Sequence, residues 1–154
     1  MTEFTRGVRL GVDVGEARVG VAICDPDGVL ATPLTTIRRD RRPDNGAVPA
    51  DMLELARLVE AHGTVEVVVG LPTTLAGREG PAARAARAYA ERLAEVVAPV
   101  PVTLADERMS TAVAARRLSE RGVRGRRQRQ VIDQVAAAEI LQGWLDAQRR
   151  RTRP

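Results

Sequence analysis

The sequence has no lysine, one histidine, one cysteine, and one each of Phe, Tyr and Trp among its 154 residues. The single cysteine, Cys24, excludes an internal disulfide and leaves no thiolate cluster for zinc. With so few aromatic rings, base stacking is excluded as the main way of recognising a nucleic acid. No apolar run approaches the roughly 20 residues of a membrane span, and the N-terminus lacks a signal-peptide pattern. We therefore expect a cytoplasmic protein that makes no membrane contact.

The length and composition predict a single globular domain. Hydrophobic residues make up 44% of the chain and charged residues 29%, which is ordinary for a protein with a buried core. There are no internal repeats and no linker. We assign residues 1–148 to the domain and residues 149–154 to an Arg-rich disordered tail.

The positive charge consists entirely of arginine and is concentrated. Seven Arg and one Glu lie from Arg116 to Arg129, and four Arg without an acid lie from Arg149 to Pro154, so the rest of the chain is acidic although the total is +4. One interpretation is contact with a nucleic acid, because Arg pairs with phosphate bidentately. Such contact would weaken steeply with salt. The alternative is a solvated helix face and a frayed tail.

The hydrophobic pattern predicts an α/β fold. Two short turns join the first three strands, which are therefore antiparallel, and the crossover helices that follow make the later strands parallel. The result is a five-stranded mixed sheet, three antiparallel strands and then two parallel ones, with helices on both faces. Sites form at the carboxyl ends of such parallel strands. The predicted strands are 8–14, 17–24, 28–37, 65–70 and 101–105, and the predicted helices are 50–62, 80–98, about 110–121 and about 128–148.

Several carboxylates occupy positions where a purely structural role would favour apolar or small residues. Asp13 ends the first strand, Asp106 and Glu107 directly follow the fifth, and Asp133 opens the last helix. If the first and fifth strands lie near each other, Asp13 and Glu107 approach at one strand end. Asp133 can join them if its helix packs closely on the sheet, which the alanines at 136–138 would permit.

Clustered carboxylates repel one another, so they need cations or a shared proton. Oxygen ligands without His or Cys suit Mg²⁺ or Mn²⁺. Two such ions about 4 Å apart can activate a water and stabilise the leaving oxygen of a phosphodiester.

Each carboxylate also has a purely structural interpretation. Asp133 could interact with the helix dipole as a first-turn residue. Asp106 could be a turn or cap residue, and Glu107 could pair with a neighbouring arginine. Asp13 is the hardest to explain in this way, since strand interiors avoid Asp.

Arginines near these carboxylates are candidate phosphate ligands. Arg18 and Arg108 flank the predicted cluster, and could either bind the scissile phosphate or neutralise Asp13 and Glu107. The stretch RGVRGRRQRQ (121–130) has two glycines that resist regular structure, which favours a mobile phosphate-binding loop. Its candidate residues are Arg124, Arg126, Arg127 and Arg129.

Five stretches in order, from about Val8 to Leu145, resemble the YqgF/RuvX family of Holliday junction resolvase-like proteins and pre-16S rRNA nucleases. They are RLGVDVGEARVGVAICD, VVVGLPTTLAGREGP, YAERLAEV, VTLADERMST and VIDQVAAAEILQGWLD. The resemblance implies an RNase H-like fold and a metal-binding catalytic set of Asp13, Glu107 and Asp133. It further implies endonucleolytic cleavage, most often at the 5′ end of the small-subunit ribosomal RNA.

The sequence departs from related proteins in two places. RuvC resolvases carry a carboxylate at the end of the fourth strand, where this chain reads GLP, so the metal site must use Glu107 instead. Ala76 stands where the family often has an acidic or amide residue.

Other functions remain open at this point. A resolvase of four-way DNA junctions shares the chemistry and needs a symmetric homodimer. A catalytically silent RNA-binding factor in ribosome biogenesis or transcription is a further alternative. An actin-like ATPase is disfavoured by the short chain and by Glu16-Ala17-Arg18 after the glycine turn. The expected partners are structured RNA, branched DNA and the ribosome.

Overall fold

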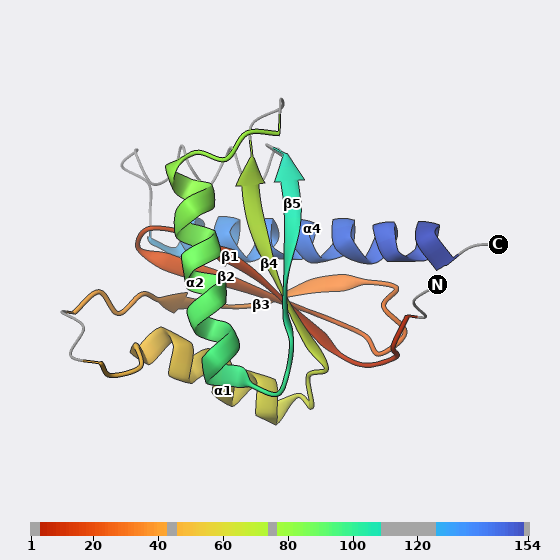
Figure 1. Ribbon diagram of the computed structural model, residues 1–154, viewed down its shortest axis with the longest axis horizontal. Helices are drawn as coiled ribbons and strands as arrows, with labels where there is room; N and C mark the ends of the chain where they lie inside the picture. Colours follow the sequence, from red (N-terminus) through yellow and green to blue (C-terminus); the bar gives the residue numbers. More distant parts are fainter. Residues whose placement is uncertain (1–3, 43–45, 74–76, 109–125, 153–154) are drawn as a thin grey trace.

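The computed structural model describes residues 4–42, 46–73, 77–108 and 126–152. Its centre is a five-stranded sheet in the order β3-β2-β1-β4-β5 (Figure 1). β1, β2 and β3 are antiparallel neighbours, whereas β4 and β5 run parallel to β1. The predicted fold class is therefore confirmed. The strands are Arg9–Val14, Arg18–Cys24, Ala31–Arg38, Glu66–Thr73 and Val102–Arg108.

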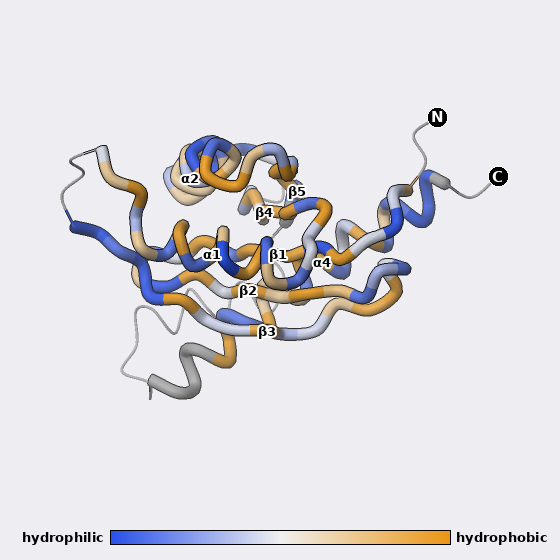
Figure 2. Tube along the Cα trace, turned by 90° about the horizontal axis from the view of Figure 1, so that it is seen from below, coloured by the Kyte–Doolittle hydropathy of each residue, from blue (hydrophilic) through white to orange (hydrophobic). Residues whose placement is uncertain are grey.

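The described helices cover both faces of the sheet. α1 (Ala50–Ala61) and α2 (Pro81–Val97) pack on one face and α4 (Arg126–Thr152) on the other, and Figure 1 shows α2 in front of the strands and α4 behind β4 and β5. The connection from β3 to α1 begins with the hydrophilic stretch drawn in blue at the left of Figure 2. In the described part of the chain no helix is long and apolar enough to cross a bilayer.

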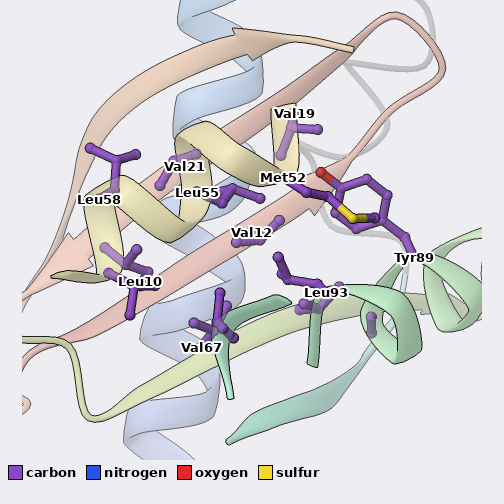
Figure 3. Close-up of a cluster of buried hydrophobic side chains, with 14 residues drawn as sticks. Leu10, Val12, Val19, Val21, Met52, Leu55, Leu58, Val67, Tyr89 and Leu93 are labelled. Carbon is purple, nitrogen blue, oxygen red and sulfur yellow. The ribbon is translucent and has the colours of Figure 1, made fainter. Parts of the chain in front are cut away.

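The face under α1 and α2 holds the main hydrophobic core. Alternate residues of β1, β2 and β4 point into it, where side chains from both helices meet them (Figure 3). Burying each of the larger aliphatic side chains contributes about 1.5–3 kcal/mol. The members with the least exposure are Leu10, Val12, Val19, Val21, Leu55, Val67, Val69 and Leu93.

The opposite face is built for close approach. A Cβ added at Gly20 of β2 would lie 2.1 Å from the carbonyl oxygen of Asp133, and one at Gly11 of β1 would lie 2.7 Å from the Cβ of Leu141. The helix contributes fully buried Ala136 and Ala137. The expected role of these alanines agrees with the structure, and two strand glycines supply the other half of the contact.

The third strand begins later than predicted. Residues 28–30 lie in the turn before β3, because the carboxylate of Asp25 accepts hydrogen bonds from the amides of Val29 and Leu30. Gly28 adopts a φ of 67°, a left-handed conformation that favours glycine. The strand therefore starts at Ala31.

The two parallel strands are longer than predicted. β4 continues through Gly70 and Pro72 to Thr73. Its pairing with β1 ends at Val69, and the bridge between Thr73 and Glu79 comes only after Pro72, so in the described part of the chain Pro72 has no ladder partner on that side and proline is tolerated. β5 in turn pairs with β4 as far as Arg108, so residues 106 and 107 lie within the strand rather than after it.

The last helix is longer than predicted at both ends. It begins at Arg126, so Arg126, Arg127 and Arg129 belong to a helix rather than to a mobile loop. It ends at Thr152, which corrects the predicted disordered tail from residue 149 onward. Arg149 is bound there, since its Nη1 donates to the Gly28 carbonyl over 2.6 Å. The predicted helix at 110–121, Arg124 and Ala76 lie outside the described residues.

A buried polar contact orders the start of α1. Asp51 is buried in the first turn and accepts hydrogen bonds from the Tyr89 hydroxyl and from the amide of Asp40. Burial and, after it, the bond to Asp51 raise the pKa of Tyr89 well above its ordinary value of 10.0. The contact joins α1, α2 and the segment after β3.

We predict that Gly20→Ala lowers the free energy of unfolding by about 3 kcal/mol or more, because the new methyl group would collide with the backbone of α4. The matched control is Gly143→Ala within the same helix. A Cβ there meets nothing within 4 Å, so this variant should gain about 0.5–1 kcal/mol from the better helix former. Urea denaturation measures both. Equal changes in unfolding free energy for the two substitutions would contradict the close approach of α4 to Gly20.

We predict that Tyr89→Phe costs about 1–3 kcal/mol at pH 7, since Asp51 loses a buried donor. The raised pKa of Tyr89 means that the unfolded chain ionises first, so the wild type loses stability as the pH rises above about 10. Tyr89→Phe has no hydroxyl to ionise and so lacks this pH dependence. The difference in unfolding free energy between the wild type and the variant should therefore shrink above about pH 10. Urea denaturation at pH 7 and pH 10.5 checks this, and a constant difference would contradict it.

Candidate active site

Asp13 lies at the carboxyl end of β1 on the face covered by α4. Side chains alternate along a strand, and the neighbouring even positions, Leu10 and Val12, belong to the core under α1 and α2. The odd position Gly11 contacts α4. Asp13 therefore faces the helix, and it is only 5% exposed.

Asp133 reaches the same place from the helix. Its carbonyl lies against Gly20 of β2, and Gly20 is the residue directly opposite Asp13 in the β1–β2 ladder. Opposed residues of an antiparallel pair have Cα atoms about 4.5–5.5 Å apart. The fold thus brings Asp13 and Asp133 together, and Asp133 is 1% exposed.

The position of Asp133 in its helix removes one alternative. α4 begins seven residues earlier, at Arg126, which is about two turns. Charges interact with the helix dipole mainly within the first turn. A helix-dipole role therefore does not explain why Asp133 is an acid.

Arg18, at the start of β2, binds Asp133. Its Nε donates to Oδ2 over 2.6 Å, and the side chains are 16% and 2% exposed. The Nη2 atom of Arg18 is buried and has no hydrogen-bond partner among the described residues. Of the two roles considered for Arg18, this ion pair corresponds to the neutralisation of a carboxylate, and the carboxylate that Arg18 binds is that of Asp133.

Glu107 lies on β5, two strands away from β1. It pairs in register with Pro72, and Ala105, two residues earlier, packs against the α4 face. Strand alternation places position 107 on that same face. The side chains of Glu107 and Arg108 are outside the described part of the chain, as are those of Arg126, Arg127 and Arg129.

Asp106 is separated from this cluster. It pairs in register with Leu71, whose side chain packs against α2, so it belongs to the other face of the sheet. Its Oδ1 accepts a hydrogen bond from the Thr73 hydroxyl over 2.8 Å. It is a strand residue, not the turn or cap residue considered from the sequence.

The donor chemistry of the site fits a hard divalent cation. Asp13, Asp133 and Arg18 together contain one more carboxylate than guanidinium, and no histidine or cysteine lies in this set. Oxygen-only ligands of this kind suit Mg²⁺ or Mn²⁺. Among the described side chains no group of three or more His, Cys, Asp or Glu could hold a metal. Glu107, the third ligand predicted from the sequence, has its side chain outside that set.

Gly20 is the site residue that sequence reasoning missed. It positions the acids by letting the helix backbone rest on the strand. The available signal was a glycine inside an apolar strand, which often marks a close approach of another backbone.

Comparisons with known proteins agree with this architecture. The model of the RuvX family, described as Holliday junction resolvase, matches residues 7–147. A protein of Nocardia farcinica is 54% identical over 145 residues, which cover 94% of this chain and 81% of that protein. A protein of Mycobacterium sp. (strain KMS) is 57% identical over 144 residues, with 94% and 82% covered. Both relatives bear the name "Putative pre-16S rRNA nuclease".

A solved structure also shares the fold. It is T. thermophilus RuvC in complex with a Holliday junction substrate, with a TM-score of 0.50 and 18% sequence identity, covering 93% of this chain and 96% of that chain. The family match spans nearly the whole chain and two relatives exceed half identity. The chain therefore belongs to the RuvX family, which confirms the family, the RNase H-like fold and the nuclease class predicted from its motifs.

Proposed function

We propose that this protein is a metal-dependent endonuclease that hydrolyses phosphodiester bonds and processes the 5′ end of pre-16S ribosomal RNA. The observation that carries the proposal is the pair of buried acids, Asp13 on the sheet and Asp133 on α4, joined across Gly20. Carboxylates are costly to bury. A chain that buries two of them at one strand end, and binds Arg18 to one, retains them for chemistry more readily than for stability.

Two metal ions, either Mg²⁺ or Mn²⁺, would be held by Asp13, Asp133 and Glu107. When bound, such ions activate a water and stabilise the leaving oxygen of a phosphodiester. The protein's own contribution is to fix the ligands. Asp13 is held by the sheet ladder, and Asp133 by the close packing of α4 and by Arg18.

Arg18 has a second part in this proposal. In the structure its guanidinium occupies Oδ2 of Asp133, one of the oxygens a metal would need. Arg18 can remain beside the cluster when the metal binds and turn its buried Nη2 toward a substrate phosphate, as can Arg108 from β5. Arg124, Arg126, Arg127 and Arg129 would contact the nucleic acid farther from the reacting bond.

The substrate is proposed from the relatives' names, which specify pre-16S rRNA. This role places the protein in the cytoplasm with the ribosome precursor as its partner. A Holliday junction resolvase is the second candidate, because that is the description of the family model, and it would require a homodimer. A silent RNA-binding factor would have no need of two buried acids.

We predict that Asp13→Asn reduces cleavage by about 100-fold or more, since metal stabilisation of the transition state is worth several kcal/mol. The assay compares precursor ribosomal RNA with a four-way DNA junction, in Mn²⁺ and in EDTA. The control is Asp27→Asn, an exposed aspartate of the β2–β3 turn. Cutting by Asp13→Asn at the wild-type rate would exclude the proposed site, and cutting of the junction alone would select the resolvase.

We predict that Arg18→Gln destabilises the metal-free protein by about 3–5 kcal/mol, because it leaves Asp133 as a buried charge without its partner. The double variant Arg18→Gln/Asp133→Asn should recover most of this loss. Mn²⁺ should stabilise Arg18→Gln more than the wild type, since ligand binding to the folded state adds to stability. Urea denaturation in EDTA and in Mn²⁺ tests this. If the double variant lost as much stability as the two single variants together, the pairing of Arg18 with Asp133 would be contradicted.

A further inference from the structure

Arg38, the last residue of β3, stands beside the site on the exposed edge of the sheet. It is directly opposite Arg18 in the β2–β3 ladder. Opposed residues of an antiparallel pair share one face, and Arg18 binds Asp133 of α4. Arg38 therefore lies on the same face as the two buried acids.

The two opposed arginines differ in how their charges are balanced. Like charges directly opposite each other on a sheet are destabilising. Arg18 is compensated by Asp133, whereas the Arg38 side chain is exposed and makes no hydrogen bond or ion pair within the described part of the chain. Several other exposed arginines are paired, for example Arg57 with Glu54 and Arg87 with Glu79. The Arg38 side chain thus has a stability cost and no partner among the described residues.

The segment that follows Arg38 is fastened to the turn between β1 and β2. The amide of Arg39 donates to the Ala17 carbonyl over 2.9 Å, and its Nη1 donates to the Gly15 carbonyl over 3.1 Å. Nη1 of Arg41 donates to the Glu16 carbonyl over 2.7 Å. This turn directly follows the strand that carries the first acid. Arg38 is consequently held at a fixed place relative to the cluster.

The charge around Arg38 favours an anion. The segment Arg38–Arg42 contains four arginines and one acid, Asp40, whose carboxylate is taken up by Arg42 and by the amide of Ala50. Figure 2 shows this segment as the hydrophilic stretch that ends at the gap 43–45. Its exposed positive charge lies about 10 Å from β1, two strand spacings away.

We propose that Arg38 binds a backbone phosphate of the nucleic acid substrate on the β3 side of the carboxylate cluster. The proposal rests on the nuclease function above. It adds that the nucleic acid substrate passes the carboxylate cluster on the side of β3. Guanidinium groups bind phosphate bidentately, and phosphate contacts position a nucleic acid without reading its sequence. A phosphate beside Arg38 would also relieve its repulsion with Arg18.

The test compares Arg38→Gln with Arg84→Gln. The Arg84 side chain is likewise exposed and has no bonded partner among the described residues, but it lies on α2, over the opposite face of the sheet. The two variants therefore remove the same charge from two faces. Binding of a fluorescent RNA spanning the 5′ end of 16S rRNA is measured by anisotropy in EDTA over a range of KCl concentrations.

Arg38→Gln should weaken RNA binding roughly tenfold and lower the slope of log K against log salt by about 1. Arg84→Gln should bind within about twofold of the wild type. The unfolding free energy of Arg38→Gln should stay equal to that of the wild type or rise, since a repulsion is removed. A purely structural role for Arg38 would lower it instead.

Equal RNA binding and equal salt slopes for the two variants would overturn the proposal. Cleavage by the wild type in Mn²⁺ is recorded on the same RNA, which separates this outcome from a failure of the nuclease function. Wild-type cleavage with unaltered binding by Arg38→Gln rejects the Arg38 contact alone. If RNA binding depends on Arg38 but the wild type does not cleave the RNA, the result supports the Arg38 contact and rejects the nuclease function. No binding by the wild type rejects both.

Discussion

The contact between the backbone of α4 and Gly20 of β2 is the constraint on which the rest of this structure depends. With no side chain between them, the helix can place the carbonyl of Asp133 directly on the strand. The Asp133 side chain then lies next to the position that β1 gives to Asp13. A methyl group at Gly20 would lift the helix and separate the two acids, so packing and chemistry share one requirement.

The rest of α4 is fixed along the sheet by polar contacts at its far end. Gln142 accepts a hydrogen bond from the amide of Ala31 and donates to the carbonyl of Val29, and Arg149 donates to the carbonyl of Gly28. These contacts hold the β2–β3 turn against the helix and determine how far the helix can slide. The position of Asp133, well over one helical turn away, therefore depends on contacts that have no part in catalysis.

The two faces of the sheet divide stability and function between them. Aliphatic side chains of β1, β2 and β4 pack with α1 and α2 into a core that bears most of the burial (Figure 3). The α4 face combines small residues with buried charges, and the Arg18–Asp133 pair contributes little net stability because desolvation offsets the attraction. The core on one face thus compensates for the cost of a charged site on the other.

Much of the fold could be predicted from the sequence. Alternation in residues 8–24, the loop glycines and the Ala-rich helix sufficed for the mixed sheet, because strand and helix periods are local properties. Boundaries were less accurate: β4 passes through Pro72 only because β1 stops pairing at Val69, which is a property of the neighbouring strand. Tyr89 and Asp51 form a buried pair although 38 positions separate them, and no local pattern could indicate this.

The same distinction between local and tertiary information applies to the candidate site. The sequence by itself determined which acids are candidates, since an aspartate after a buried strand or amid apolar helix residues is costly unless it has a use. Only the tertiary structure decided that Asp106 belongs to the other face, that Arg18 is bound to Asp133, and that Arg38 lies on the same face of the sheet as Arg18. The physical reason is register: a shift of one residue in a strand moves a side chain to the opposite face, and register is set by pairing between distant segments.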